Sequence, residues 1–470
     1  MLIHEALRIQ TGDVVCLVGG GGKTTLMFRL ADELTAAGLK VVTTMTTKIF
    51  VGQMSRAPAR VVRQGEGSLL AQLPGMLAEH GQVLVAGSTL VEEDKVKGLE
   101  PALVDRIAAH HSVDAVVIEA DGSRRLPFKA PAAHEPVIPS SATVVVPIVG
   151  LDVLGRPLTA EHVHRADRVA ALTGASLGEP VIPAMIAAVL AHPDGGGKAV
   201  PASARLIPFL NKVEDEVTLL AAREIARLLL HAAGGVAGTA SAPRVDSVLI
   251  GAALADDPVV EVWGRTAAVV LAAGQAKRFG VLKQVLPWQG VPLVAHVARQ
   301  AQACLDIDHV IVTTGASSQQ VRDALDPSAA DPKLTIVDVA DWASGQSRSV
   351  RAGLRVAQDS VGTLSGALFL LADQPGVSTE LLSALVQRHR ETLAPVVAPR
   401  YEGQRGNPVL FDRRTFAEFS TLTGDVGARS IIRRHEDAIA WVDWPSAKIL
   451  RDIDTPDDYA AAQSENRPPS

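Results

Sequence analysis

Residues 16–27 read CLVGGGGKTTLM: an apolar run, four glycines, a lysine, two threonines and the start of a helix-like segment. A second turn of this kind lies within residues 267–287, AAVVLAAGQAKRFGVLKQVLP. A buried strand, a glycine-rich turn and a helix are a typical opening of nucleotide-binding α/β domains. The two stretches therefore predict two nucleotide-handling domains in tandem.

The rest of the chain agrees with an α/β fold of two three-layer domains. Val- and Ile-rich runs alternate with Ala- and Leu-rich stretches, which predicts largely parallel sheets. The clearest helix is expected over residues 24–37, before Gly38. Strands are expected at residues 14–18, 41–44, 83–86, 115–119, 143–149, 205–210 and 247–250, and then at 267–271, 309–313, 334–337, 367–371, 396–399 and 448–453.

The boundary between the domains is expected at residues 256–265, DDPVVEVWGR, where periodicity breaks and charge rises. This gives a first domain over residues 1–255, a second over residues 266–463 and a disordered tail over residues 464–470.

Composition excludes several classes of protein. The net charge of -6 is spread along 470 residues, which argues against binding of nucleic acid. The two cysteines, Cys16 and Cys304, fall in different domains, so we expect no disulfide framework and a reducing compartment. No apolar run is long enough to span a bilayer, so we expect a cytoplasmic protein without a membrane partner.

The first glycine-rich turn resembles the Walker A loop, although Leu17 stands where that pattern has its first glycine. Backbone N–H groups of the glycines can face phosphate oxygens, and the following helix adds its positive end. Lys23 would reach the outer phosphates and Thr24 would bind Mg²⁺. The predicted loop comprises Gly19, Gly20, Gly21, Gly22, Lys23, Thr24 and Thr25. The alternative is a strand–helix connection without a ligand, as expected for the GGGK that ends at Lys198 and is followed by Ala, Val and Pro.

Two further stretches can complete this site. Residues 115–122, AVVIEADG, predict a strand that ends in Glu119 and Asp121, either of which could hold Mg²⁺ or order a water. Residues 211–215, NKVED, partly match the N-K-x-D guanine reader, but a helix that simply starts at Asn211 explains them equally well. The nucleotide of the P-loop could therefore be ATP or GTP.

The segments CLVGGGGKTT, VVTTMTTKI and VVIEADGSRRLPFKAP are similar to a P-loop family of accessory proteins of selenium-dependent hydroxylases. The resemblance covers about residues 11–251. It implies a P-loop NTPase-like domain with a role in the maturation of molybdenum hydroxylases.

The second turn is more specific, because it matches L-A-A-G-x-x-x-R-[FM]-G-x-x-K. Its small residues let a nucleotide approach the backbone closely, while Arg278 and Lys283 would offset the charge of the leaving pyrophosphate. The predicted nucleotide site comprises Leu271, Ala272, Ala273, Gly274, Arg278 and Lys283.

Acids follow two expected strands of the second domain. Residues 367–375, ALFLLADQP, lead to Asp373, and residues 450–458, LRDIDTPDD, contain Asp452 and Asp454. Carboxylates from two strand ends can converge on one Mg²⁺. Strand parity does not separate Asp452 from Asp454, because residues two apart share a face.

These motifs, with GQSRSVRAGL, RGNPVLF and GDVGAR, resemble the molybdenum cofactor nucleotidyltransferases, most closely the CTP:molybdopterin cytidylyltransferases. The match covers about residues 266–459 and implies a Rossmann-like nucleotidyltransferase domain. It assigns catalysis to Arg278, Lys283 and Asp373, and it assigns Mg²⁺ to Asp373 and Asp454. It places on the substrate side Gly345, Ser347, Ser349, Asn407 and Asp425. The guanylyltransferase branch usually has a glycine at the position of Ala273, so the alanine favours CTP.

The leading hypothesis is therefore Mg²⁺-dependent transfer of CMP from CTP to molybdopterin, assisted by a nucleotide-binding domain that matures or delivers the cofactor to an apo molybdenum hydroxylase. One alternative is a molybdopterin guanylyltransferase, or a nucleotidyltransferase for a sugar phosphate or an isoprenoid precursor. Another is an NTP-driven chaperone that delivers the cofactor to the hydroxylase.

Overall fold

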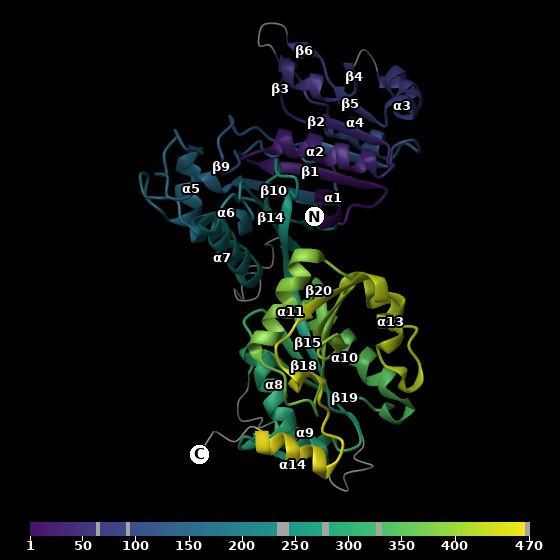
Figure 1. The fold of residues 1–470 in the computed structure, drawn as a ribbon. Helices are drawn as coiled ribbons and strands as arrows, with labels where there is room; N and C mark the ends of the chain where they lie inside the picture. Colours follow the sequence, from purple (N-terminus) through teal and green to yellow (C-terminus); the bar gives the residue numbers. More distant parts are fainter. Residues whose placement is uncertain (63–65, 91–94, 233–243, 275–281, 326–330, 466–470) are drawn as a thin grey trace. The chain divides into compact units, whose positions relative to one another are not determined.

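The computed structural model describes residues 1–62, 66–90, 95–232, 244–274, 282–325 and 331–465 (Figure 1). The chain divides into two compact units, Met1–Trp263 and Gly264–Ser470. The division lies inside one strand, β15 (Val259–Leu271). This strand runs through much of residues 256–265, the segment in which the sequence analysis placed the domain boundary.

The first unit is built on a parallel sheet in the order β4-β5-β2-β8-β1-β10-β13-β14, with the short β12 also beside β10. Residues of its central strands are almost all buried, as expected when both faces of a parallel sheet are covered. The strands are β1 (Asp13–Gly19), β2 (Val41–Met45), β4 (Ala59–Val62), β5 (Gln82–Ala86), β8 (Ala115–Glu119), β10 (Val144–Gly150), β12 (Arg205–Leu206), β13 (Phe209–Asn211) and β14 (Ser247–Gly251).

Helices cover both faces of this sheet. Val14, Cys16 and Val18 point to one face and pack in a cluster with apolar residues of α3, α4, α6 and α7. Val15 and Leu17 point to the other face and are also fully buried. The helices are α1 (Ile3–Ala6), α2 (Lys23–Ala36), α3 (Glu66–His80), α4 (Pro101–Ala108), α5 (Ala166–Thr173), α6 (Pro183–Ala191) and α7 (Glu216–Ala232). Short strands form two small sheets: β3 (Ile49–Phe50), β6 (Thr89–Leu90) and β7 (Lys95–Val96), and β9 (Phe128–Lys129) with β11 (Val163–His164).

The second unit has a mixed sheet in the order β19-β18-β15-β20-β23-β21-β24. Its first four strands are parallel, and β23 runs antiparallel between β20 and β21. The strands of this sheet after β15 are β18 (His309–Thr314), β19 (Leu334–Asp338), β20 (Leu364–Leu371), β21 (Val396–Tyr401), β23 (Val409–Asp412) and β24 (Ile439–Asp443). The short strand β22 (Gln404–Arg405) pairs with β21. A separate small hairpin consists of β16 (Pro287–Trp288) and β17 (Val291–Pro292).

This sheet is also the middle of three layers. Ala268 and Val270 pack with apolar residues of α8 and α11, whereas Ala267 and Val269 pack with those of α10. The alternation along β15 therefore separates two apolar layers. The helices are α8 (Leu293–Ala303), α9 (Ser318–Ala324), α10 (Gln346–Val361), α11 (Thr379–Thr392), α12 (Phe416–Phe419), α13 (Arg429–Arg434) and α14 (Pro456–Glu465).

The structure corrects two expected strands. Residues 448–453 are no strand: a 3₁₀ turn (Ala447–Leu450) leads into an irregular loop, and the late strand is β24. The expected strand over residues 205–210 breaks into β12 and β13 at Pro208, which has no N–H to donate to a neighbouring strand. Asp452 and Asp454 therefore lie on a loop, and the argument from strand parity does not apply to them.

No helix in the described parts of the chain has the length and apolar character needed to cross a bilayer.

Gly353 in α10 tests how closely this helix approaches the sheet. A Cβ at this position would lie 2.4 Å from Val269 Cγ1, a buried β-branched side chain that cannot move away. We expect Gly353→Ala to lower the free energy of unfolding by about 1–3 kcal/mol.

The matched control is Gly75→Ala in α3, where an added Cβ meets no atom within 4 Å. It should raise stability by about 0.5–1 kcal/mol because alanine favours a helix. Urea unfolding followed by circular dichroism measures both. Equal effects of the two substitutions would contradict the close approach.

Candidate functional site

The glycine-rich turn of the first unit connects β1 to α2. Gly19, Gly21 and Gly22 have φ of +92°, +81° and +132°, and a Cβ on Gly21 would lie 2.2 Å from Gly150 N. Glycine is therefore required here by backbone conformation and close packing. The helix begins at Lys23, one residue earlier than expected.

We expected the glycine N–H groups of this turn to face phosphate oxygens, and the structure corrects this expectation. Gly19 N–H donates to the Asp121 carboxylate at 3.0 Å, Gly20 N–H to Ile148 O at 2.8 Å and Gly21 N–H to Leu126 O at 3.1 Å. These donors are thus used within the protein and do not face a phosphate. The first turn of a helix leaves its N–H groups without helical acceptors, so the donors for an anion are those of residues 22–25.

Two buried acids lie beside Lys23, at the end of β8. Its Nζ donates to Gly19 O at 2.6 Å and lies 3.3 Å from Asp121 Oδ1 and 3.9 Å from Glu119 Oε1. Thr24 Oγ1 donates to Glu119 Oε2 at 2.8 Å. Burial raises the pKa of Glu119, although Lys23 and Thr24 act in the opposite direction. The fold brings together the predicted lysine, threonine and both acids.

Three residues that sequence reasoning missed extend this cluster. Lys129 Nζ donates to Asp121 Oδ2 at 2.9 Å, to Gly122 O at 2.7 Å and to Glu135 Oε2 at 2.7 Å. Arg165 also donates to Glu135, at 2.7 Å. Despite burial, which acts to raise it, the bonds to Arg165 and Lys129 lower the pKa of Glu135 to about 2. The only sequence signal was that Lys129 lies within the quoted stretch VVIEADGSRRLPFKAP.

Residues of the NKVED stretch make hydrogen bonds to other parts of the first unit. Asn211 donates to Gly21 O at 2.7 Å and accepts from Ala253 N–H at 2.9 Å. Asp215 accepts from Thr218 N–H at 2.8 Å and therefore caps α7. This helix starts at Glu216, and not at Asn211 as one reading of the sequence suggested.

In the second unit, a cavity of about 440 Å³ lies where β15 and β20 end. Eight residues that the sequence analysis had selected line it: Leu271, Ala273, Gly274, Lys283, Gly345, Ser349, Asp373 and Asp425. Carboxyl ends of adjacent parallel strands are the usual ligand site of an open α/β sheet. Arg278 lies outside the described residues.

Lys283 joins the two loops that carry the acids. It donates to Asp373 and, at 2.9 Å, to Asp454 Oδ1. Burial alone would lower the pKa of Lys283, but Asp373 and Asp454 outweigh it and raise that pKa above its ordinary value. The two carboxylates meet on one cationic atom, so they can also converge on one metal cation.

Asp452 differs from Asp454. It accepts a hydrogen bond from Gln374, and burial, together with the charges of Asp373 and Asp454, raises its pKa. Among the described residues, no group of three or more His, Cys, Asp or Glu side chains is placed to hold a metal ion.

Residues expected on the substrate side are divided between two places. Asp425 Oδ1 accepts from Gln346 N–H at 3.2 Å at the start of α10, so it lies against the main cavity. Asn407 lines a smaller cavity of about 100 Å³, which shares Leu271 and Gln346 with the main one. Ser347 is buried and is not part of either lining.

Comparison with known proteins gives a family for each unit. The model of the YqeC protein family matches residues 15–167, and that of the MobA-like NTP transferase domain matches residues 268–439. The chain is 34% identical over 212 residues to YqeC of Escherichia coli (strain K12), covering 45% of this chain and 80% of that protein.

Three further relatives are each covered over more than nine tenths of their length. Purine catabolism protein PucB of Bacillus subtilis (strain 168) is 31% identical, with 41% of this chain and 92% of that protein covered. Nicotine blue oxidoreductase of Paenarthrobacter nicotinovorans is 32% identical, with 40% and 91% covered. Molybdenum cofactor cytidylyltransferase of Escherichia coli (strain K12) is 24% identical, with 42% and 94% covered. The chain therefore belongs to the YqeC family in its first unit and to the MobA-like NTP transferase family in its second.

Proposed function

We propose that the second unit transfers CMP from CTP to molybdopterin and releases pyrophosphate. The observation that carries the proposal is the meeting of Lys283, Asp373 and Asp454 at a cavity formed by Ala273 and Gly274. Membership of the MobA-like family supports nucleotidyl transfer. A relative named molybdenum cofactor cytidylyltransferase supports the choice of substrates.

The reaction needs no strong base. A terminal phosphate oxygen of molybdopterin is already anionic at neutral pH, and it forms a bond to the α-phosphorus of CTP. The bond between the α-phosphorus and the bridging oxygen breaks, and pyrophosphate leaves with that electron pair. The site must therefore hold the two phosphates in line and neutralise charge.

Each residue of the cluster has a part in this scheme. Lys283 neutralises negative charge on the leaving phosphates. Asp373 and Asp454 would hold Mg²⁺, which supplies charge stabilisation at the phosphates when bound. The small Ala273 and Gly274 let the nucleotide approach the end of β15, and Gly345, Gln346 and Ser349 form another part of the wall.

The purified chain should form a dinucleotide from molybdopterin and CTP with Mg²⁺, and more slowly or not at all from GTP, ATP or UTP. Asp373→Asn should lower the rate by about 10²–10³-fold, because a charged ligand of the Mg²⁺ that stabilises the phosphates is lost. Mass spectrometry of the product and pyrophosphate release give the result.

The matched control is Asp359→Asn, an exposed change on α10 that should leave the rate unchanged. Full activity of Asp373→Asn would refute the site assignment. Turnover of a sugar phosphate or an isoprenoid precursor, but not of molybdopterin, would favour the alternative nucleotidyltransferases.

Ala273 tests the choice of base. Its methyl group lines the cavity and narrows the space beside the nucleotide. Ala273→Gly should raise kcat/KM for GTP relative to CTP by about tenfold, the usual scale for one methyl group in a pocket. An unchanged ratio in competition assays would mean that the preference arises elsewhere.

We further propose that the first unit binds ATP or GTP at residues 19–25 and assists maturation of the cofactor or its delivery to an apo molybdenum hydroxylase. Support comes from Lys23 and Thr24 at a helix start, with Glu119 and Asp121 beside them. A phosphate entering this turn would attract Lys23 away from Asp121, while Lys129 would continue to neutralise that acid.

Lys23→Ala should weaken binding of a fluorescent ATP or GTP analogue by about ten- to a hundredfold, since a charged hydrogen bond is lost. Lys198→Ala, in the other GGGK segment, should leave affinity unchanged. Thr24→Val, which is nearly isosteric, should abolish only the Mg²⁺-dependent part of binding.

The same variants separate two roles of the first unit. Loss of hydroxylase maturation with intact cytidylyl transfer would indicate cofactor delivery. Loss of transfer itself would show that the two activities depend on each other. Equal nucleotide affinity of Lys23→Ala and Lys198→Ala would contradict the predicted P-loop.

A further inference from the structure

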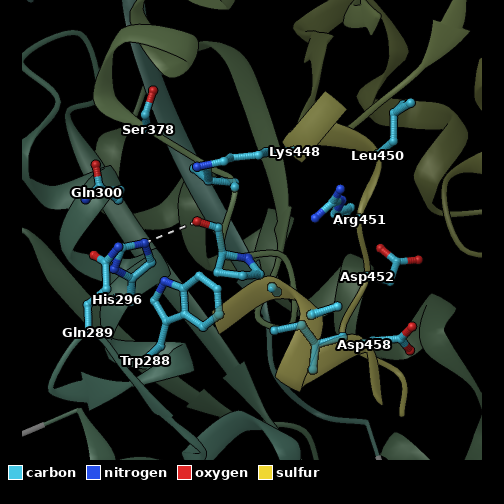
Figure 2. Close-up of a pocket in the computed structure, with 16 residues that line it drawn as sticks. Trp288, Gln289, His296, Gln300, Ser378, Lys448, Leu450, Arg451, Asp452 and Asp458 are labelled. Atoms are coloured by element: carbon cyan, nitrogen blue, oxygen red, sulfur yellow. Dashed lines mark hydrogen bonds between the residues drawn. The ribbon is translucent and has the colours of Figure 1, made fainter. Parts of the chain in front are cut away.

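The second unit contains another cavity, of about 580 Å³, behind the acid-bearing loops (Figure 2). Residues 375–378, which follow Asp373 and Gln374, form part of its wall, and residues 448–453 form another part. Its volume is typical of a site for a small ligand. The nucleotide cavity described above does not share these wall residues.

One side of this cavity carries a buried hydrogen-bond donor without a partner among the described residues. Trp288 is 3% exposed, yet its indole N–H donates to no described residue. A buried donor without a partner is costly, so this N–H points to a ligand that supplies an acceptor. The half-buried Gln300 accepts from Thr379 N–H at 3.2 Å, which directs its carbonyl oxygen to the backbone and leaves its NH₂ group as a second donor.

His296 adds an acceptor to the same side. Its Nε2 lies 3.3 Å from Pro375 O, and a carbonyl can only accept, so Nε2 carries the hydrogen (Figure 2). Burial lowers the pKa of His296, which keeps the ring neutral at pH 7 and makes Nδ1 an acceptor. Trp288 and Gln300 thus offer donors, and His296 offers an acceptor, on the same side of the cavity. These three groups match the acceptors and donors along the edge of a flat nitrogen heterocycle.

The opposite side is charged. In Figure 2, Arg451, Asp452 and Asp458 lie across the cavity from Trp288 and His296, with Lys448 between the two groups. Asp458 caps α14 by accepting from Thr455 N–H at 2.8 Å, and Asp452 accepts from Gln374. Lys448 and Arg451 line this side as well, and their positive charges suit an anionic group on the ligand.

The wall of the cavity is linked directly to the acids of the nucleotidyl-transfer site. Ile453 N–H donates to Asp373 O at 3.1 Å, and Gln374 bonds to Asp452. A Cβ on Gly376 would lie 2.3 Å from Lys448 O, so the two loops are in backbone contact. A ligand that moves either loop would therefore displace the acid that this loop carries, Asp373 or Asp454.

We propose that this cavity is a second nucleotide site, which takes a nucleoside monophosphate and regulates the nucleotidyl-transfer site through these two loops. The heterocycle lies beside Trp288 and His296, and the phosphate lies toward Lys448 and Arg451.

Binding is tested by equilibrium dialysis of radiolabelled CMP, AMP and GMP against a chain that carries Lys23→Ala and Lys283→Ala. These changes remove the two lysines expected at the other nucleotide sites. We expect one mole of at least one monophosphate bound per mole of chain, with cytidine, adenosine, guanosine and ribose 5-phosphate at least tenfold weaker. Absence of nucleotide binding in this background would overturn the proposal.

The cavity itself is tested by filling it from α14. Ala461 is exposed and lines the cavity, whereas Ala460 is exposed on the same helix and does not. Ala461→Phe should weaken binding at least tenfold and Ala460→Phe should not. Trp288→Phe, which removes the N–H, should weaken it several-fold. Equal affinities of the two alanine variants would also refute the site.

Regulation has a separate readout in the chain with an intact transfer site. Ala461→Phe should leave basal transfer unchanged but abolish the effect of the monophosphate on KM for CTP. If the chain shows no transfer at all, the dialysis result still decides whether the cavity binds a nucleotide. The failure of one proposal is thus distinguishable from the failure of the other.

Discussion

A lysine after a glycine-rich turn, held by a carboxylate at the end of the neighbouring parallel strand, organises both units. In the first unit Lys23 follows β1 and lies against Glu119, the last residue of β8, and Asp121, which follows β8. In the second, Lys283 follows β15 and bonds to Asp373, which follows β20. Adjacent parallel strands end at the same edge, so charges distant in sequence meet there. Each sheet is buried on both faces, which leaves this edge as the place for polar chemistry.

The two units surround this pairing differently. In the first unit the acids are nearly fully buried, and Lys129, Glu135 and Arg165 extend the cluster into a connected set of charges. Each buried charge in this set needs a partner, because an unpaired buried charge is costly. If a ligand binds one lysine, the acid beside that lysine must therefore be neutralised by another cation of the set. In the second unit the side chain of Asp454 is half exposed and pairs with Lys283, which lines a cavity. This difference agrees with the two proposals, nucleotide binding in the first unit and nucleotidyl transfer in the second.

Much of the second site could be predicted because its motifs are local. The stretch LAAG, the lysine of its pattern and LADQP each follow a buried strand, and parallel pairing of β15 with β20 brings them together. The loop with Asp454 was misjudged as a strand, since the apolar residues of KILRDI (residues 448–453) can equally occur in a 3₁₀ turn and a loop. Lys129 was missed as a site residue because its role depends on β9, a two-residue strand without a periodic signal.

The sequence by itself determined the two glycine-rich openings, the alternation of buried strands and helices, and the residues that carry charge at each turn. These follow from local requirements, such as positive φ at Gly19, Gly21 and Gly22, and from the burial of apolar strands. Only the tertiary structure decided which acid meets which lysine, that Gly19–Gly21 N–H groups are used internally, and that a second cavity lies behind Asp373. Those outcomes depend on contacts between loops distant in the chain, and such contacts have no periodicity from which they could be predicted.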